Sequence, residues 1–263
     1  MKTKIQGSGF RIPNRRRRFI GFFILNFSFL IAATAAPEGD ARFERTFADA
    51  AKAYDENRLP DAIAGWQALV DEGQALPEVL FNLGNACYRH GDLGKAILAY
   101  RAAQRRAPRD PDIRANLGFA AQAAGIELPA RRPLAALLLD FSRAEWLGIG
   151  AAAFWLLAAA LAAWIAWPRR RAVARPAAAI LAAALLLALA GLALHRDLQR
   201  FPEGVVMVRE QKLLSGPLET ATPLLAVPAG AIVRMRESRG IWVEIELGET
   251  RGWLPAAALA PVP

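Results

Sequence analysis

Two long apolar runs stand out from a chain whose hydrophobic positions otherwise recur with helical or strand spacing. Residues 146–167 (WLGIGAAAFWLLAAALAAWIAW) and 177–194 (AAAILAAALLLALAGLAL) contain no charged side chain. A bilayer's hydrocarbon core is about 30 Å thick, and a helix needs roughly 20 apolar residues to cross it. The pattern therefore predicts two transmembrane helices that form a hairpin. A hairpin buried inside a soluble protein is the less favoured alternative.

The segment between the two runs predicts how the hairpin is oriented. Residues 168–176 (PRRRAVARP) carry arginines and no acidic residue. Short loops rich in Lys and Arg stay on the cytoplasmic side of a membrane. We therefore expect a cytoplasmic loop at 168–176 and both outer ends of the hairpin on the other side. The juxtamembrane linker, residues 129–145, is expected to form a short amphipathic helix in the membrane interface or a helix packed on the preceding repeats.

The first 36 residues have the order of a targeting segment. Seven basic and no acidic residues occur there, and the apolar run Phe19–Ile31 is followed by small residues at Ala32–Ala36. This order predicts a signal peptide, residues 1–36, or an uncleaved anchor. In either case residue 37 onward is exported, which agrees with the predicted hairpin orientation.

Residues 43–128 repeat with a period of 34. The recurring pairs include Phe47 and Phe81, Tyr54 and Tyr88, Leu59 and Leu93, and Trp66 and Tyr100. This period and spacing resemble the tetratricopeptide repeat, a helix–turn–helix unit. We expect units at 43–76 and 77–110 and a partial third or cap at 111–127. Gly91, or Asn57 in the first unit, is predicted to end the first helix in a left-handed conformation.

The first helix of each tetratricopeptide unit lines the inner surface of such an array. Resemblance to the family places Asn82, Asn85, Arg89 and Asn116 on this surface as candidate peptide-binding residues. The alternative is that these residues are typical of the family and have no ligand. Cys87 replaces the usual Tyr and is interpreted as a small core residue rather than a reactive thiol.

Residues 203–262 have the short alternating segments and turns of an all-β unit. Strands are expected near Val205–Val208, Ala231–Met235, Ile241–Leu247 and Arg251–Leu254, with a hairpin turn between the last two. Ile241, Val243, Ile245 and Leu247 are predicted to share one face. The pattern favours a small barrel. Its Gly-Trp-Leu ending resembles a bacterial SH3-like domain, which implies binding of peptides or cell-wall material. Trp242 and Trp253 are the candidate surface residues, and a spacer role is the alternative.

Charge and composition disfavour several classes of protein. The formal net charge is +9, but the positive excess lies in residues 1–36 and 131–200, whereas 37–130 and 201–263 are slightly acidic. A nucleic-acid-binding protein carries its positive charge on a folded face, so we expect no nucleic-acid partner. The single cysteine excludes an internal disulfide. His90 and His195 are the only histidines, and no phosphate-loop, GxSxG or HExxH motif occurs. We therefore expect no catalytic site, no metal site and no cofactor.

The order of segments adds specificity that no single motif has. A signal segment, a short tetratricopeptide array, a two-helix hairpin and an SH3-like domain together resemble the E component of the Bat aerotolerance proteins (BatE-like). This resemblance implies a non-enzymatic scaffold in the bacterial inner membrane, with both globular modules periplasmic. Its implied partners are von Willebrand A-domain membrane proteins and a MoxR-type ATPase. The alternative function is a cell-envelope sensor that binds peptidoglycan or peptides through the SH3-like domain.

The expected fold class is therefore a multi-domain membrane protein. It combines all-α tetratricopeptide repeats, a two-helix transmembrane hairpin and a small all-β SH3-like barrel.

Overall fold

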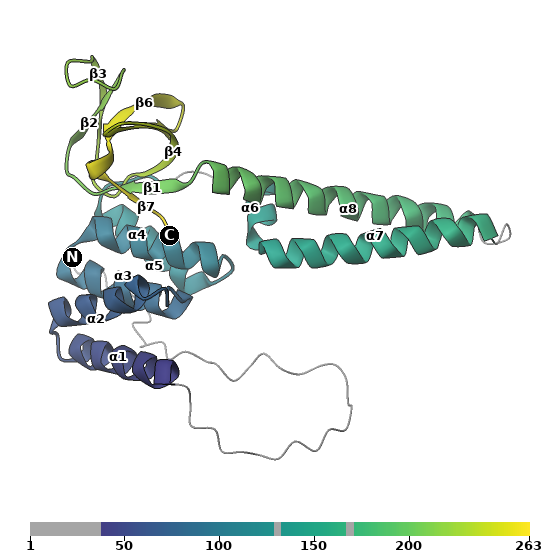
Figure 1. The fold of residues 1–263 in the computed structure, drawn as a ribbon, viewed down its shortest axis with the longest axis horizontal. Helices are drawn as coiled ribbons and strands as arrows, with labels where there is room; N and C mark the ends of the chain where they lie inside the picture. The colour runs from purple at the N-terminus through teal and green to yellow at the C-terminus, as the bar shows by residue number, and fades with distance from the viewer. Residues whose placement is uncertain (1–37, 129–132, 167–170) are drawn as a thin grey trace. The chain divides into compact units, whose positions relative to one another are not determined.

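The computed structural model describes residues 38–128, 133–166 and 171–263 (Figure 1). The chain divides into two compact units, one ending at Glu127 and the other spanning Leu128–Val262. The predicted signal segment, residues 1–36, lies outside the described residues.

The first unit is a tandem array of helical hairpins, as the 34-residue period predicts. Its helices are α1 (Glu38–Asp55), α2 (Leu59–Asp71), α3 (Pro77–His90), α4 (Leu93–Arg106) and α5 (Pro111–Ala123). Proline occupies one of the first two positions of α2, α3 and α5. Proline suits these positions because its fixed φ matches a helix and the first backbone N–H groups have no helical partner.

The same turn ends the first helix of each repeat. Asn57, Gly91 and Gly125, spaced 34 residues apart, have φ values of 59°, 92° and 69°. In each turn the next residue donates its N–H to a carbonyl one helical turn back, as Asp92 does to Cys87 over 2.9 Å. Left-handed residues of this kind close a helix by satisfying its last carbonyl groups. The predicted helix ends at Asn57 and Gly91 are thus confirmed.

Close packing of α3 on α4 depends on the absence of a side chain at Gly84. A Cβ atom at this position would lie 2.6 Å from ring atoms of Tyr100, which is completely buried. In the first repeat the corresponding approach is made by Gly65, whose Cβ would lie 2.8 Å from that of Ala50. A small residue at each crossing lets the helices approach and buries Trp66 and Tyr100 between them.

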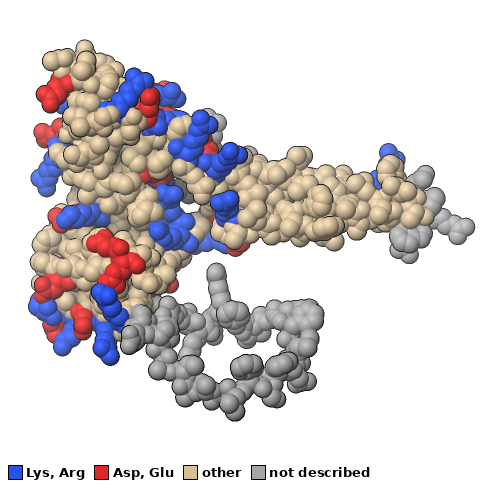
Figure 2. Space-filling view, viewed as in Figure 1, with Lys and Arg blue, Asp and Glu red and all other residues tan. Residues whose placement is uncertain are grey.

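The second unit begins with three helices. They are α6 (Pro133–Asp140), α7 (Arg143–Ala166) and α8 (Arg171–Arg200), and α7 and α8 form a long hairpin. Residues 143–166 and 175–197 are long and apolar enough to cross a membrane. Figure 2 shows that the visible face of this hairpin is almost bare of charge between its two ends.

The hairpin differs from its prediction where its two helices are connected. Helix α8 begins at Arg171, so the second half of the expected loop is helical and Pro176 lies inside the helix. Alanine and arginine are strong helix formers, which accounts for this extension. At the other end, Leu138 of α6 packs with Trp146 and Ala188, so α6 covers the base of the hairpin.

The remaining residues of the second unit form an antiparallel sheet with strand order β3-β2-β6-β5-β4-β1-β7. Its strands are β1 (Glu203–Val206), β2 (Gln211–Leu214), β3 (Pro223–Val227), β4 (Ile232–Arg239), β5 (Trp242–Leu247), β6 (Thr250–Pro255) and β7 (Leu259–Pro261). Its main core is aliphatic and includes Val206, Leu213, Ile245 and Leu254.

The sheet differs from the predicted barrel because it is not closed. Strands β2, β3 and β7 were not predicted from the sequence pattern. Strand β7 pairs with β1 at one edge of the sheet, β3 forms the other edge, and these two edge strands do not pair with each other. The predicted hairpin turn between β5 and β6 is present, with Leu247 opposite Thr250. Ile241 was predicted to share the buried face of this strand, but it precedes β5 and is 70% exposed.

The packing of Gly84 against Tyr100 predicts opposite effects for two equivalent glycines. Gly84→Ala should lower the local unfolding free energy by about 1–3 kcal/mol because its methyl group overlaps the ring. Gly118, one period later in α5, is the matched control because nothing lies within 4 Å of its Cβ position. Gly118→Ala should raise the unfolding free energy by up to about 1 kcal/mol through helix propensity. Amide hydrogen exchange in α3 to α5 of the full-length protein in detergent measures both, and equal effects would contradict this packing.

Candidate functional site

Two of the predicted peptide-binding residues are hydrogen-bonded to each other inside the helical repeats. Asn85 Oδ1 on α3 accepts a hydrogen bond from the hydroxyl of Tyr100 on α4 over 2.7 Å. The same oxygen accepts another from Nδ2 of Asn116 on α5 over 3.0 Å. Burial raises the pKa of Tyr100 above its usual range, so its hydroxyl stays protonated and remains a donor. This network therefore connects three consecutive helices.

All three predicted asparagines are buried. Asn82, Asn85 and Asn116 are 2%, 7% and 4% exposed. Buried amides must be hydrogen-bonded, and the oxygen of Asn85 already has two donors. Asn85 and Asn116 therefore have a clear structural role, and their peptide-binding role stays a prediction.

Arg89, the fourth predicted residue, is exposed and lies in the last turn of α3. Its guanidinium carbon lies 4.3 Å from the centre of the Tyr54 ring, and its Nη2 donates to Oδ1 of Asn57 over 2.9 Å. Tyr54 and Asn57 are at the end of α1 and in the turn after it. Arg89 thus connects the second repeat to the first, and its charged group is the exposed part of the predicted site.

Trp242 and Trp253, the predicted surface residues of the all-β unit, are largely buried. They are 9% and 7% exposed and form a small cluster with Leu214 and Ala221, separate from the main core. The guanidinium of Arg239 lies 5.2 Å from the centre of the Trp253 ring. The two indoles therefore stabilise the second face of the sheet, and a ligand-binding role for them stays a prediction.

Charged side chains on β4 and β5 pair with one another. Arg236 and Glu246 form an ion pair, and this hydrogen-bonded guanidinium lowers the pKa of Glu246 below its usual range. The guanidinium carbon of Arg236 also lies 4.4 Å from the centre of the Phe201 ring, just after α8. These contacts tie the sheet to the end of the hairpin.

The part of the chain that the structure describes contains no cluster of metal-binding side chains. No group of three or more His, Cys, Asp or Glu side chains there is arranged to hold a metal ion. His90 is exposed, whereas His195 Nε2 lies 2.9 Å from the carbonyl oxygen of Phe141.

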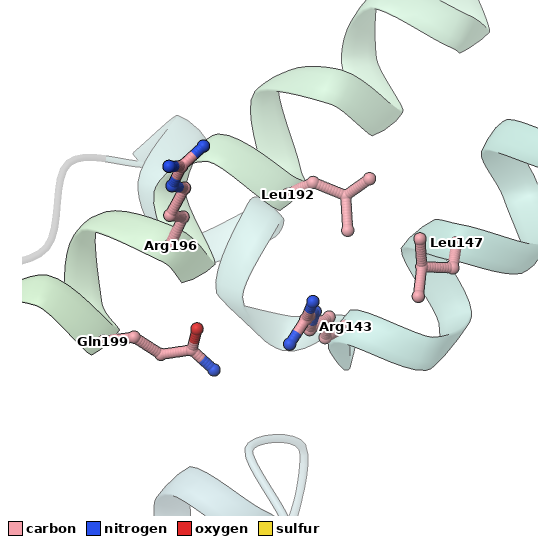
Figure 3. Close-up of a pocket in the computed structure, with 5 residues that line it drawn as sticks. All are labelled: Arg143, Leu147, Leu192, Arg196 and Gln199. Atoms are coloured by element: carbon pink, nitrogen blue, oxygen red, sulfur yellow. The ribbon is translucent and has the colours of Figure 1, made fainter.

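A pocket of about 340 Å³ lies at the base of the hairpin and was not foreseen from the sequence (Figure 3). We call it the base pocket, and its lining residues are Arg143, Leu147, Leu192, Arg196 and Gln199. Helix α7 contributes the first two and α8 the others. Their spacing of three or four residues within each helix is the signal that indicates a shared face.

Comparison with known proteins identifies one repeat. The tetratricopeptide repeat family model matches residues 77–110, which correspond to α3, α4 and their turns. No curated protein matches the chain, and no solved structure matches it. Together with the tandem helices around it, the match indicates a role in binding other proteins.

The surroundings of Cys87 predict that its thiol is unreactive in the folded protein. Cys87 is 1% exposed, and burial raises its pKa to about 12. Because the thiolate is the reactive form, alkylation at pH 8 should be slowed at least about a hundredfold relative to the unfolded chain. Mass spectrometry after iodoacetamide treatment, with and without denaturant, measures this ratio. Equal labelling in both states would instead identify an accessible, reactive thiol.

Proposed function

We propose that this chain is a non-enzymatic membrane adaptor whose tetratricopeptide repeats bind a protein partner. The observation that carries the proposal is the match to the repeat model at residues 77–110, inside tandem helical hairpins and in the same chain as a long apolar hairpin. The helical array has the fold of a recognition module, and the hairpin supplies an anchor. This combination holds a bound protein at a membrane surface.

Exposure of the hairpin supports its insertion into a membrane. Only 6% and 11% of its two most apolar windows are buried, and Trp155 and Ile165 are 71% and 73% exposed. A soluble protein rarely leaves so large an apolar surface in water, because burial stabilises by about 25 cal/mol per Å². Hydrocarbon would cover this surface. Arginines at 169–171 and 175 then favour a cytoplasmic connection.

Two crossings return the chain to the side from which it entered. The repeats and the antiparallel sheet therefore share one side in this proposal, and the signal-like segment favours the periplasm of a bacterial inner membrane. The BatE-like order of segments further supports partners of the von Willebrand A-domain and MoxR types. The sheet, with its Gly252-Trp253-Leu254 strand, is proposed as an SH3-like module, and peptidoglycan binding by this module is the second candidate function.

Cysteine labelling tests the proposed topology. Single cysteines replace the exposed residues Asp49, Glu219 or Val173 in a Cys87→Ala background. A membrane-impermeant maleimide added to spheroplasts should label Asp49→Cys and Glu219→Cys, whereas Val173→Cys should react only after the membrane is opened. Labelling of all three in intact spheroplasts would contradict a membrane-crossing hairpin.

Affinity purification tests the adaptor role. Full-length protein isolated in mild detergent should retain A-domain membrane proteins or a MoxR-type ATPase, identified by mass spectrometry. Arg89→Ala should reduce this recovery at least about fivefold if the exposed guanidinium contacts the partner. Lys95→Ala on α4 is the matched control because it removes an exposed charge from the second helix of the same repeat.

The outcomes of the purification separate the two candidate functions. Equal recovery by wild type and Arg89→Ala would exclude Arg89 from the interface. Loss of every protein partner, together with retention of the full-length protein on purified sacculi, would contradict the adaptor and favour peptidoglycan binding.

A further inference from the structure

The base pocket is lined by arginines towards one end and by leucines towards the other, and both helices follow this order. On α7, Arg143 and Leu147 are four residues apart, and on α8, Leu192 and Arg196 have the same spacing. Each leucine therefore lies about one helical turn closer to the middle of the hairpin than its arginine. In Figure 3 each arginine lies nearer Gln199 than the leucine of its own helix does. Gln199 continues the row on α8 one turn beyond Arg196.

The two arginines keep their positive charge unpaired. Among the described residues, no carboxylate lies within ion-pair distance of Arg143 or Arg196. The neighbouring acids are oriented towards other groups. Glu145 accepts a hydrogen bond from the backbone N–H of Ser142 over 2.7 Å, and Asp197 pairs with Arg234 at 3.2 Å. The pocket therefore carries a net positive charge, to which the N-terminus of α7 adds a partial one.

Packing beneath the pocket holds its two walls together. The ring of Trp146 fills the space left by Gly191, where a Cβ would lie 2.5 Å from the indole. Its Nε1 donates to the carbonyl oxygen of Leu138 over 2.8 Å. His195 Nε2 lies 2.9 Å from the carbonyl oxygen of Phe141. These contacts fix α8 against α6 and α7 immediately beside the arginines, and both arginines line the same pocket.

Lipid chemistry matches this lining. In a membrane-inserted hairpin, residues 143 and 196 lie at the boundary between hydrocarbon and water. A phospholipid presents its phosphate at that depth and its acyl chains one turn deeper. Arginine binds phosphate oxygens through charge-assisted hydrogen bonds, and the leucines contact hydrocarbon. A free phosphate would use the arginines and leave the leucines exposed.

We propose that the base pocket binds the headgroup phosphate of an acidic phospholipid, with Arg143 and Arg196 as its ligands and Gln199 as a donor to the headgroup. An acidic lipid is favoured over a zwitterionic one because no carboxylate of the pocket is available to pair with a choline or ethanolamine group. This proposal rests on the proposed insertion of the hairpin in a membrane. The bound lipid would fix the base of the hairpin at the membrane surface.

Lipid titration of the full-length protein tests the site. Delipidated protein in mild detergent is mixed with phosphatidylglycerol or phosphatidylcholine, and bound lipid is counted by native mass spectrometry. Phosphatidylglycerol should bind more tightly, and Arg143→Gln/Arg196→Gln should weaken its binding about tenfold or more, because the phosphate would lose its charge-assisted hydrogen bonds to two guanidinium groups. Arg171→Gln/Arg175→Gln is the matched control because it removes the same charge from the far end of the hairpin, and it should retain wild-type affinity.

Further measurements show which result would contradict the lipid-binding proposal. Displacement of the lipid by excess inorganic phosphate would show that the site takes free phosphate, and equal binding of both lipids would show no headgroup selection; either overturns the proposal. Equal weakening by both double variants would assign the effect to overall charge and overturn it as well. Val173→Cys labelling in the same variants reports insertion separately. If the hairpin is inserted but the protein does not select acidic lipid, only the lipid-binding proposal is wrong. If the hairpin of the wild-type protein is not inserted, the proposal of a membrane adaptor is wrong as well.

Discussion

An aromatic ring seated against a glycine of the facing helix holds together both helical parts of this protein. In the repeats, Tyr100 lies on Gly84, and in the hairpin, Trp146 lies on Gly191. Each ring also carries a polar group to a buried partner: the Tyr100 hydroxyl to Asn85, and the Trp146 indole N–H to Leu138. At each ring, close packing on the glycine and a buried hydrogen bond thus stabilise the same contact between helices. Displacing either ring would both open a helix contact and leave a buried polar group without its partner.

The hydrogen-bond network in the repeats changes how their recognition surface is understood. Asn85 joins α3 to α4 and α5, so its amide stabilises the contacts between consecutive helices. Removing it would alter binding through the fold even if no partner touched it. Arg89 is different because its charged group is exposed while its stacking on Tyr54 fixes its position. A fixed, exposed charge loses little conformational entropy on binding, which is a useful property for a recognition residue.

The hairpin carries two groups of arginines with different physical roles in our proposals. Those at positions 169–171 and 175 come between the two apolar runs of the sequence, and their charge opposes transfer across a membrane and so sets orientation. Arg143 and Arg196 lie at its open end and converge on one pocket. Convergence distinguishes a binding site from a topogenic signal, because only arginines held on facing helices can share one anion.

The sequence by itself determined the local periodicities. The 34-residue repeat, the left-handed residues Asn57 and Gly91, and the two apolar helices follow from patterns that neighbouring residues impose on the backbone. Four strands were also predicted, near β1, β4, β5 and β6, but β2, β3 and β7 were not. Strand β7 is short and lies in an alanine- and proline-rich segment, and its pairing with β1 joins residues far apart in the chain. For the same reason the sheet's open edges followed from no local pattern.

Only the tertiary structure decided which of the candidate side chains are exposed and could contact a ligand. The asparagines and tryptophans that resembled a binding surface are buried, because helices and strands distant in sequence pack over them. Conversely, Arg143 and Arg196 are 53 positions apart, and the predicted hairpin put both at its outer ends without showing that they line one pocket. Only the packing of α7 on α8 around Trp146 and Gly191 brought them together. The burial of a side chain, and the meeting of two arginines in one pocket, depend on contacts between residues far apart in the chain. The spacing of apolar residues depends only on the local backbone geometry. The sequence therefore determined the helices and several strands, whereas the folded chain decided which side chains are exposed and which share a site.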